Sequence, residues 1–355
     1  MKTEQKQSIS RKVCRVSYGS DISSESFVAS CGVMYDNLHR EVNNVKKFTN
    51  NNRGFEKFIA YTKKHLKSIN LVDNAEVWFV MEASGVYYEN LAYFLNKKGL
   101  NVHVALANKV KNFTRTMENK SKNDELDSRA ISLYGLEKQL LQWKPMSEEM
   151  KKLKELIREL ISTKETAAGI KNQLHAKNSG HEMNPQTIKR INQQIKFFKA
   201  QTEKIKKDIE KVLEENPELK ERTNKISTHL KGVGLQTVIT VISETNKFTD
   251  IRNRRQLTSY AGFDIVENQS GKRTGKTRIS KKGNSIIRKA LYLPAITSIR
   301  FDKKMYDLYH RVCERHGWVS KRIGIVAVMR KLLHIIYALW KNGEEYDPNY
   351  GVMVV

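Results

Sequence analysis

A periodic row of apolar residues in the middle of the chain places the strongest constraint on its fold. Between Ile188 and Val212 the apolar positions advance alternately by three and four residues, with one interruption at Thr202. This spacing is the a/d seam of a heptad repeat, and it predicts a long helix that packs along a second helix. The expected partner is a helix at 150–176, and the Gly/Asn/Pro-containing break between them predicts an antiparallel hairpin. The spacing leaves two interpretations open, an internal packing arm and a dimerisation arm. The seam residues are Ile188, Ile191, Ile195, Phe198, Thr202, Ile205, Ile209 and Val212.

The hairpin divides the 355-residue chain into three expected domains. Residues 1–146 alternate strand-like apolar runs with amphipathic helical patterns, which predicts an α/β domain with crossover connections. Residues 147–222 hold the helical hairpin, and residues 223–355 are mixed but mainly helical. In the first domain the expected strands are 13–21, 26–36, 75–82 and 101–107, and the expected helices are 54–70 and 87–99.

The charge of the chain indicates the kind of partner. Lys and Arg number 64 against 38 Asp and Glu, a formal net charge of +26. A surface with so much like charge repels itself, and nucleic acid is the commonest polyanion that offsets it. The three cysteines are scattered without a CxxC pair, which argues against a disulfide framework or a zinc ribbon. We find no uninterrupted membrane-spanning apolar run and no signal-peptide core, so we expect a soluble, cytoplasmic protein with no membrane partner.

Four acidic residues stand where strands end or helices begin. Asp21 follows the first expected strand, and Glu82 ends the apolar run VWFVME. Carboxylates at adjacent strand ends meet at the edge of an α/β sheet. Asp124 and Asp127 are three residues apart and share one helical face. Such oxygen ligands suit Mg²⁺ or Mn²⁺, and a pair of these ions clamps a phosphate during in-line displacement.

Each acid also has a structural interpretation. Asp21 fits a turn or cap, and Asp124 fits a helix N-terminal acid that the helix dipole favours. Asp127 fits a solvated position on the same face. Glu82 is harder to explain in this way, because an acid that closes so apolar a run is desolvated unless a cation meets it.

A strongly basic loop follows in the third domain, and one serine opens it. From Lys272 to Lys289 the sequence has eight Lys or Arg and no Asp or Glu, and Ser270 stands just before them. A serine hydroxyl is a weak nucleophile unless its proton is removed or a metal binds its oxygen. Cations around it hold a phosphate and stabilise the charge that builds on it. On the residues alone, a plain loop with non-specific backbone contacts is the simpler interpretation. The candidate phosphate contacts are Lys272, Arg273, Lys276, Arg278, Lys281, Lys282 and Arg288.

Four stretches in this order resemble the DEDD insertion-sequence transposases, whose serine-dependent members are the bridge-RNA-guided recombinases. They are Asp21 after a strand, MEASGVY around Glu82, KNDELDSRA at 122–130, and SGKRTGKTRISKKGNSIIRKAL from Ser270. The resemblance covers nearly the whole chain. It implies a ribonuclease-H-like, Holliday-junction-resolvase-like N-terminal domain, a coiled-coil linker and a C-terminal transposase domain.

The resemblance also implies roles for single residues. Asp21, Glu82, Asp124 and Asp127 would bind the metal, and Ser270 would form a covalent bond with DNA. The implied partners are the DNA of element ends and target, a structured guide RNA, and further copies of the chain in a homodimer or higher homo-oligomer. One departure is that the family often has a lysine shortly after the first aspartate, where this chain reads DISSES.

Three functions follow from these observations. The first is a metal-dependent transposase or site-specific DNA recombinase that uses Ser270. The second is a structure-selective nuclease, in which the four acids cut DNA with water and the serine is inert. The third is a non-catalytic nucleic-acid scaffold. Replacing Ser270 separates the first two, and replacing Glu82 separates both enzymes from the scaffold.

Overall fold

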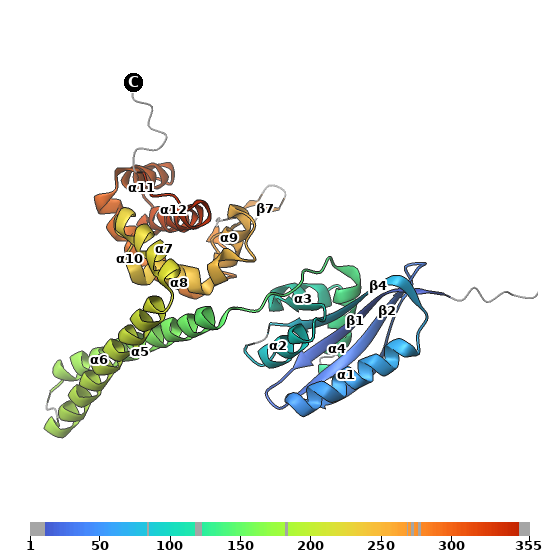
Figure 1. Cartoon of the computed structure of the whole chain (residues 1–355). Helices are drawn as coiled ribbons and strands as arrows, with labels where there is room; N and C mark the ends of the chain where they lie inside the picture. The colour runs from blue at the N-terminus through green and yellow to red at the C-terminus, as the bar shows by residue number, and fades with distance from the viewer. Residues whose placement is uncertain are drawn as a thin grey trace, which may run out of the picture. The chain divides into compact units, whose positions relative to one another are not determined.

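The computed structural model describes the chain apart from residues 1–10, 84, 118–122, 182–183, 268, 271–272, 276–277 and 348–355. The chain divides into two compact units, Met1–Pro145 and Met146–Val355. The N-terminal unit is built on a β-sheet, whereas helices make up most of the C-terminal unit (Figure 1). The expected order of an α/β part followed by a mainly helical part is therefore confirmed.

The N-terminal unit contains a mixed five-stranded sheet with the strand order β3-β2-β1-β4-β5. The pairs β1–β2 and β2–β3 are antiparallel, and the pairs β1–β4 and β4–β5 are parallel. The apolar run that ends at Glu82 is an interior strand between β1 and β5, as its composition predicted. The strands are β1 Val13–Ile22, β2 Ser26–Tyr35, β3 Arg40–Thr49, β4 Leu71–Glu82 and β5 Val102–Ala105.

Helices cover both faces of this sheet. On one face, Phe58 of α1 lies 5.2 to 6.1 Å, between ring centroids, from Phe48, Phe27 and Tyr18 of the strands. On the opposite face, α4 packs against glycine and serine residues of β1 and β2. Because side chains alternate along a strand, Tyr18 faces α1 and its neighbour Gly19 faces α4. The helices are α1 Asn52–Lys67, α2 Glu89–Lys97, α3 Ala107–Thr114 and α4 Asp124–Glu137.

The edge strand β3 has no counterpart among the strands expected from the sequence. Its pairing with β2 shifts between Ala29 and Cys31, and Asn44 adopts a left-handed φ of 60° beside this shift. An extra residue of this kind is a β-bulge. It sets Val42 and Val45 three positions apart, which hides the two-residue alternation of a strand. The strand is also rich in lysine, a common property of sheet edges.

The C-terminal unit begins with two long helices, α5 (Glu148–Asn178) and α6 (Pro185–Glu214). They pack side by side as an antiparallel hairpin (Figure 1). All eight seam residues between Ile188 and Val212 are buried or half-buried, and most positions between them are exposed. The periodic row is therefore the packing face of α6, as predicted.

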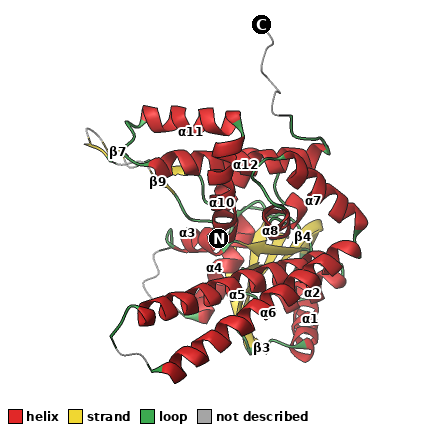
Figure 2. Cartoon of the chain, turned by 90° about the vertical axis from the view of Figure 1, so that its left-hand side faces the viewer, coloured by secondary structure: helices red, strands yellow, loops and turns green. Residues whose placement is uncertain are grey.

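The base of the hairpin shares one apolar core with the remaining helices. Leu153 and Ile157 of α5 and Ile209 of α6 lie in the same buried cluster as residues of α8, α10 and α12. Figure 2 shows helices throughout this unit, with short strands at β7 and β9. The elements are α7 Pro217–His229, α8 Leu235–Glu244, the 3₁₀ helix η1 Asn246–Phe248, α9 Arg254–Ala261, α10 Ser285–Phe301, α11 Lys303–Arg315 and α12 Lys321–Asn342.

Among the described residues, one helix, α12, has the length and apolar composition of a membrane span. It has 22 residues, and 44% of its most apolar stretch, with a mean hydropathy of 1.6, is buried inside the protein. Val328, Leu332 and Ile336 on its inner face are fully buried. Core helices of globular proteins meet the same two criteria.

The basic segment expected as a loop carries two short antiparallel ladders. Strand β6 (Ile265–Val266) pairs with β9 (Arg278–Ile279), and β7 (Gln269–Ser270) pairs with β8 (Arg273–Thr274). The backbone of Ser270 therefore lies opposite that of Arg273, in the second of the two ladders.

Candidate active site

Two of the four candidate acids lie side by side at the carboxyl ends of two parallel strands. Ser20 of β1 pairs with Met81 of β4, so Asp21 and Glu82 occupy the next position in the same register. Adjacent strands are about 4.8 Å apart, and residues in register point to the same face of the sheet. Both acids are half-buried. The sheet thus brings together two carboxylates that are far apart in the sequence.

The other two acids begin α4, and the packing of this helix fixes the end of the sheet at which they lie. Ser132 Oγ, in the middle of α4, accepts a hydrogen bond from the Gly19 amide at 2.9 Å. The carbonyl of Leu136, near the end of α4, accepts one at 3.2 Å from Arg15, near the start of β1. The helix therefore runs antiparallel to β1. Its first turn, which carries both acids, points toward the strand end that carries Asp21.

The helix lies close to the sheet because glycines stand on both sides of the contact. A Cβ atom on Gly19 would lie 2.6 Å from the Ser128 carbonyl oxygen and 2.7 Å from the Ile131 carbonyl carbon. A Cβ atom on Gly135 would lie 2.7 Å from Val80 Cγ2. Any larger side chain at these positions must push the helix away. The two glycines therefore set the height of α4 above the sheet, and with it the height of the acids in its first turn.

The first turn of α4 concentrates negative charge at a place that favours it. Asn123 caps the helix by accepting a hydrogen bond from the Leu126 amide at 2.8 Å. Asp124, Glu125 and Asp127 follow within the first turn. The positive end of the helix dipole stabilises carboxylates there and offsets part of their mutual repulsion.

In the C-terminal unit, a buried carboxylate holds the base of the loop that carries Ser270. The side chain of Glu244, the last residue of α8, is fully buried. It accepts two hydrogen bonds from Arg158 of α5, at 2.7 and 2.9 Å, and one from the Asn284 amide group at 2.7 Å. Burial alone would raise the pKa of Glu244, but the bonds from Arg158 and Asn284 hold this pKa below its usual value. We call Arg158, Glu244 and Asn284 the loop clamp.

The two ends of the loop also meet through glycine. Gly262 has a φ of 70°, which glycine adopts without strain. A Cβ atom on Gly283 would lie 2.5 Å from the amide nitrogen of Gly262. Arg288 Nη1 donates to the carbonyls of Ala261 and Gly283, at 2.7 and 3.1 Å. Burial lowers the pKa of Arg288. Arg288 thus joins the two ends of the loop through Nη1. The contact of Arg288 with phosphate stays a prediction.

Two family models match the chain. The DEDD transposase model of IS110 elements matches residues 18–177, and the model of the transposase IS116/IS110/IS902 family matches residues 224–310. The chain carries the two domains of the IS110-family transposases. The first match includes all four candidate acids, and the second includes Ser270 and two members of the loop clamp.

Two relatives are pilin gene-inverting proteins, one from Moraxella bovis and one from Moraxella lacunata. Each is 24% identical to this chain over 302 residues, which is 84% of the chain and 89% of the relative. Together with the family matches, they identify the chain as an enzyme of the transposase and recombinase class. It acts on DNA, and its DEDD-type domain implies dependence on a divalent metal ion.

The acids of this transposase have the donor chemistry that a divalent ion requires. Asp21, Glu82, Asp124 and Asp127 all offer hard carboxylate oxygens. Asp21 and Glu82 lie at the strand ends toward which the first turn of α4, with Asp124 and Asp127, points. Within the described parts of the chain, no three His, Cys, Asp or Glu side chains lie close enough together to form a metal site. The scaffold brings the four candidate acids toward one edge of the sheet, and their binding of a metal ion stays a prediction.

The other loop residues of the transposase are placed as follows. Arg278 in β9 is exposed, as are Lys281 and Lys282 between β9 and α10. Lys272 and Lys276 lie outside the described residues. Glu244 is not among the site residues predicted from the sequence, although it closes the apolar run LQTVITVISE just as Glu82 closes VWFVME. An acid at the end of an apolar run was thus a usable signal in both units.

Proposed function

We propose that this transposase cleaves and rejoins insertion-sequence DNA through a covalent serine–DNA bond. Ser270 is the nucleophile, and Asp21, Glu82, Asp124 and Asp127 hold Mg²⁺ or Mn²⁺. The observation that carries the proposal is the register of the sheet, which sets Asp21 beside Glu82 at the edge toward which the acidic first turn of α4 points. A divalent ion bound by these oxygens would polarise a phosphoryl oxygen and offset negative charge on the phosphate.

The proposed reaction conserves the number of phosphate ester bonds. Ser270 Oγ loses its proton and forms a bond to phosphorus, and the bond from phosphorus to one deoxyribose oxygen breaks. That oxygen leaves as a hydroxyl after it takes up a proton. In the reverse direction, a deoxyribose hydroxyl of another strand attacks the phosphoserine ester and releases the serine. Exchange of strands then needs no external source of energy, whereas hydrolysis by a nuclease would lose the ester bond.

The basic loop supports this role for Ser270. Arg273 and Arg278, and the lysines that follow, supply positive charge for the scissile phosphate and for the charge that develops on it. The loop clamp holds the base of this loop on the helical core, so that the loop starts and ends at fixed points. The four acids and Ser270 belong to different units, and the proposal requires both to act on one phosphodiester.

The finer architecture and the partners belong to the same proposal. We infer a ribonuclease-H-like N-terminal domain, a coiled coil in the α5–α6 hairpin, and assembly of the chain into a homodimer or higher homo-oligomer. The net charge of +26 supports a second nucleic-acid partner, a structured RNA that selects the DNA. The names of the two relatives describe inversion of a gene, and the same strand exchange between two sites on one DNA molecule would produce it.

The test is a denaturing gel of protein incubated with Mg²⁺ and DNA that carries the ends of its element. We expect a protein–DNA species that disappears in Ser270→Ala and persists in the matched variant Thr274→Ala, which removes a hydroxyl from the same loop. Glu82→Gln is expected to abolish the species while DNA binding, measured by fluorescence anisotropy, is retained.

Two results would contradict the proposal. Nicking of DNA at the wild-type rate by Ser270→Ala would identify a nuclease that uses water. Unchanged strand exchange by Glu82→Gln would remove the acids from the chemistry. Retained DNA binding without any cleavage by the wild-type protein, with Mg²⁺ and Mn²⁺ alike, would favour the scaffold.

A further inference from the structure

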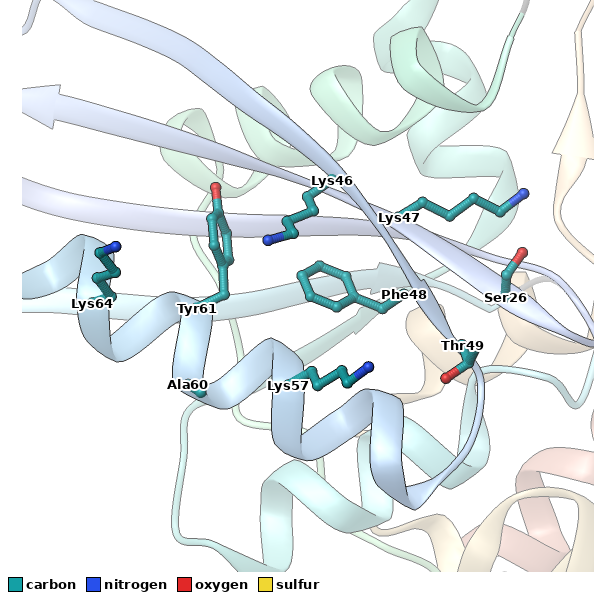
Figure 3. A pocket seen from close by; sticks show the side chains of 9 residues that line it. All are labelled: Ser26, Lys46, Lys47, Phe48, Thr49, Lys57, Ala60, Tyr61 and Lys64. Atoms are coloured by element: carbon teal, nitrogen blue, oxygen red, sulfur yellow. The ribbon is translucent and has the colours of Figure 1, made fainter.

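A basic groove lies between the edge strand β3 and helix α1. It has a volume of about 700 Å³, and four of its nine lining residues are lysines. Figure 3 shows Lys57 and Lys64 on α1 and Lys46 on β3 around the aromatic rings of Phe48 and Tyr61, with the side chain of Lys47 pointing away from these rings. The lining contains no carboxylate. The groove is therefore a concentration of positive charge within the N-terminal unit. The lining residues are Ser26, Lys46, Lys47, Phe48, Thr49, Lys57, Ala60, Tyr61 and Lys64.

The lysines of the groove are accessible to an external partner. None of the four belongs to an ion pair among the described residues, and all four are exposed. Lys46 Nζ lies over the rings of Tyr61 and Phe48, at 5.3 and 5.9 Å from their centroids. These cation–π contacts hold the side chain over the groove without neutralising it.

The register of the sheet connects this groove to the candidate acids. Asp21 of β1 pairs with Val28 of β2, and Val28 pairs with Lys47 of β3. With Glu82 next to Asp21, these residues form one row across four strands, and residues in register share a face. At about 4.8 Å per strand, the Cα of Lys47 is roughly 10 Å from that of Asp21, or about three base pairs of DNA at 3.4 Å each. Lys47 also lines the groove, so it belongs to the acid row and to the groove at once.

We propose that the groove binds the sugar-phosphate backbone of duplex DNA next to the cleavage site. This inference rests on the proposed function, because it takes the acid row as the place where the phosphodiester is cut. The backbone leaves the acids, passes Lys47 and crosses the edge of the sheet into the groove, where Lys46, Lys57 and Lys64 contact successive phosphates. Lysine is a point charge without a fixed hydrogen-bonding fork, so these contacts are independent of base sequence.

The competing explanation is that the lysines only protect the edge. Lysine on an outer strand prevents another strand from pairing with it. This explanation covers Lys46 and Lys47 on β3. It does not cover Lys57 and Lys64, which lie on α1 and still face the same groove.

The test compares two double variants of α1 in the full chain. Lys57→Gln/Lys64→Gln removes two groove charges, and Lys63→Gln/Lys67→Gln removes two exposed charges of the same helix that do not line the groove. The affinity for a fluorescent 30-base-pair duplex of arbitrary sequence is measured by anisotropy, in EDTA and over a range of salt concentrations. Circular dichroism confirms that each variant is folded. An RNA hairpin of equal length is measured in parallel.

We expect the groove variant to bind duplex DNA roughly tenfold more weakly, with a salt dependence reduced by about two ions, and the control variant to bind much as the wild type does. Equal losses in both double variants, or none, would overturn the inference. A loss confined to the RNA hairpin would overturn the assignment to DNA. Because EDTA prevents cleavage, a failure of the serine mechanism leaves this measurement unaffected, and the two failures are distinguishable.

Discussion

The contact between Gly19 and α4 leads to a quantitative prediction. In Gly19→Ala the new methyl group would lie 2.6 Å from the Ser128 carbonyl oxygen and 2.7 Å from the Ile131 carbonyl carbon. Both are backbone atoms of a regular helix, so the helix must retreat by about 1 Å to reach an ordinary contact distance. The hydrogen bond from the Gly19 amide to Ser132 Oγ is then lost. We expect destabilisation of about 2–4 kcal/mol, from overpacking and from the lost hydrogen bond.

The same displacement moves the acids of the first turn of α4. A misplacement of 1 Å in a catalytic group typically costs about 10²-fold in rate. We therefore expect Gly19→Ala to lose DNA cleavage by about this factor at temperatures where it is still folded. Urea unfolding followed by circular dichroism measures the stability, and the yield of cleaved DNA in single-turnover reactions measures the rate.

Gly32→Ala is the matched control for this experiment. Gly32 lies on the neighbouring strand under the same helix, but a Cβ atom there meets only side-chain atoms, at 3.0 Å from Leu136 Cδ1 and 3.3 Å from Ser132 Cβ. Side chains adjust more easily than a helix backbone, so the loss of stability is expected to stay near 1 kcal/mol or below. Equal stability and equal cleavage in Gly19→Ala, Gly32→Ala and the wild type would refute the reasoning.

Three further predictions concern the C-terminal unit, each read out by urea unfolding of the full chain. Glu244→Gln is expected to cost about 1–2 kcal/mol at neutral pH, a value limited because Arg158 is 48% exposed. The wild type should lose this contribution as the pH falls through the lowered pKa of Glu244. Burial and nearby basic residues lower the pKa of His334 from 6.5 to about 4, so the folded protein favours the neutral imidazole. The free energy of unfolding should therefore fall by on the order of 1 kcal/mol between pH 6.5 and pH 4. This fall should be absent in His334→Gln. Ile205→Ala in the seam should cost about 2–4 kcal/mol, and Phe197→Ala, at a residue 55% exposed, should change stability by less than about 0.5 kcal/mol.

The parts of the fold that the sequence predicted carry regular periodicity. The seam on α6 repeats over seven turns, and β4 is an unbroken apolar run that ends in Glu82. These signals are local, and they survive in the structure because each element buries the face that its own sequence marks. The acids at strand ends and on the first turn of α4 could be selected for the same reason.

The parts that were missed depend on distant residues or on an irregular backbone. The bulge at Asn44 breaks the alternation of β3, so the edge strand and its groove have no periodic signature. The loop clamp joins Arg158 to Glu244, which are 86 residues apart in the chain. Nothing in the sequence around either residue identifies the other as its hydrogen-bonding partner. Such pairings become visible only once the helices are packed.

The loop clamp has a consequence for anyone who recombines parts of related transposases. A chimera that takes the helical hairpin from one protein and the basic loop from another would separate Arg158 from Glu244 and Asn284. A buried carboxylate left without its guanidinium is costly to keep, so the grafted pieces would assemble poorly even if each were sound by itself. The exchangeable module is therefore the hairpin together with α8, the loop and the start of α10.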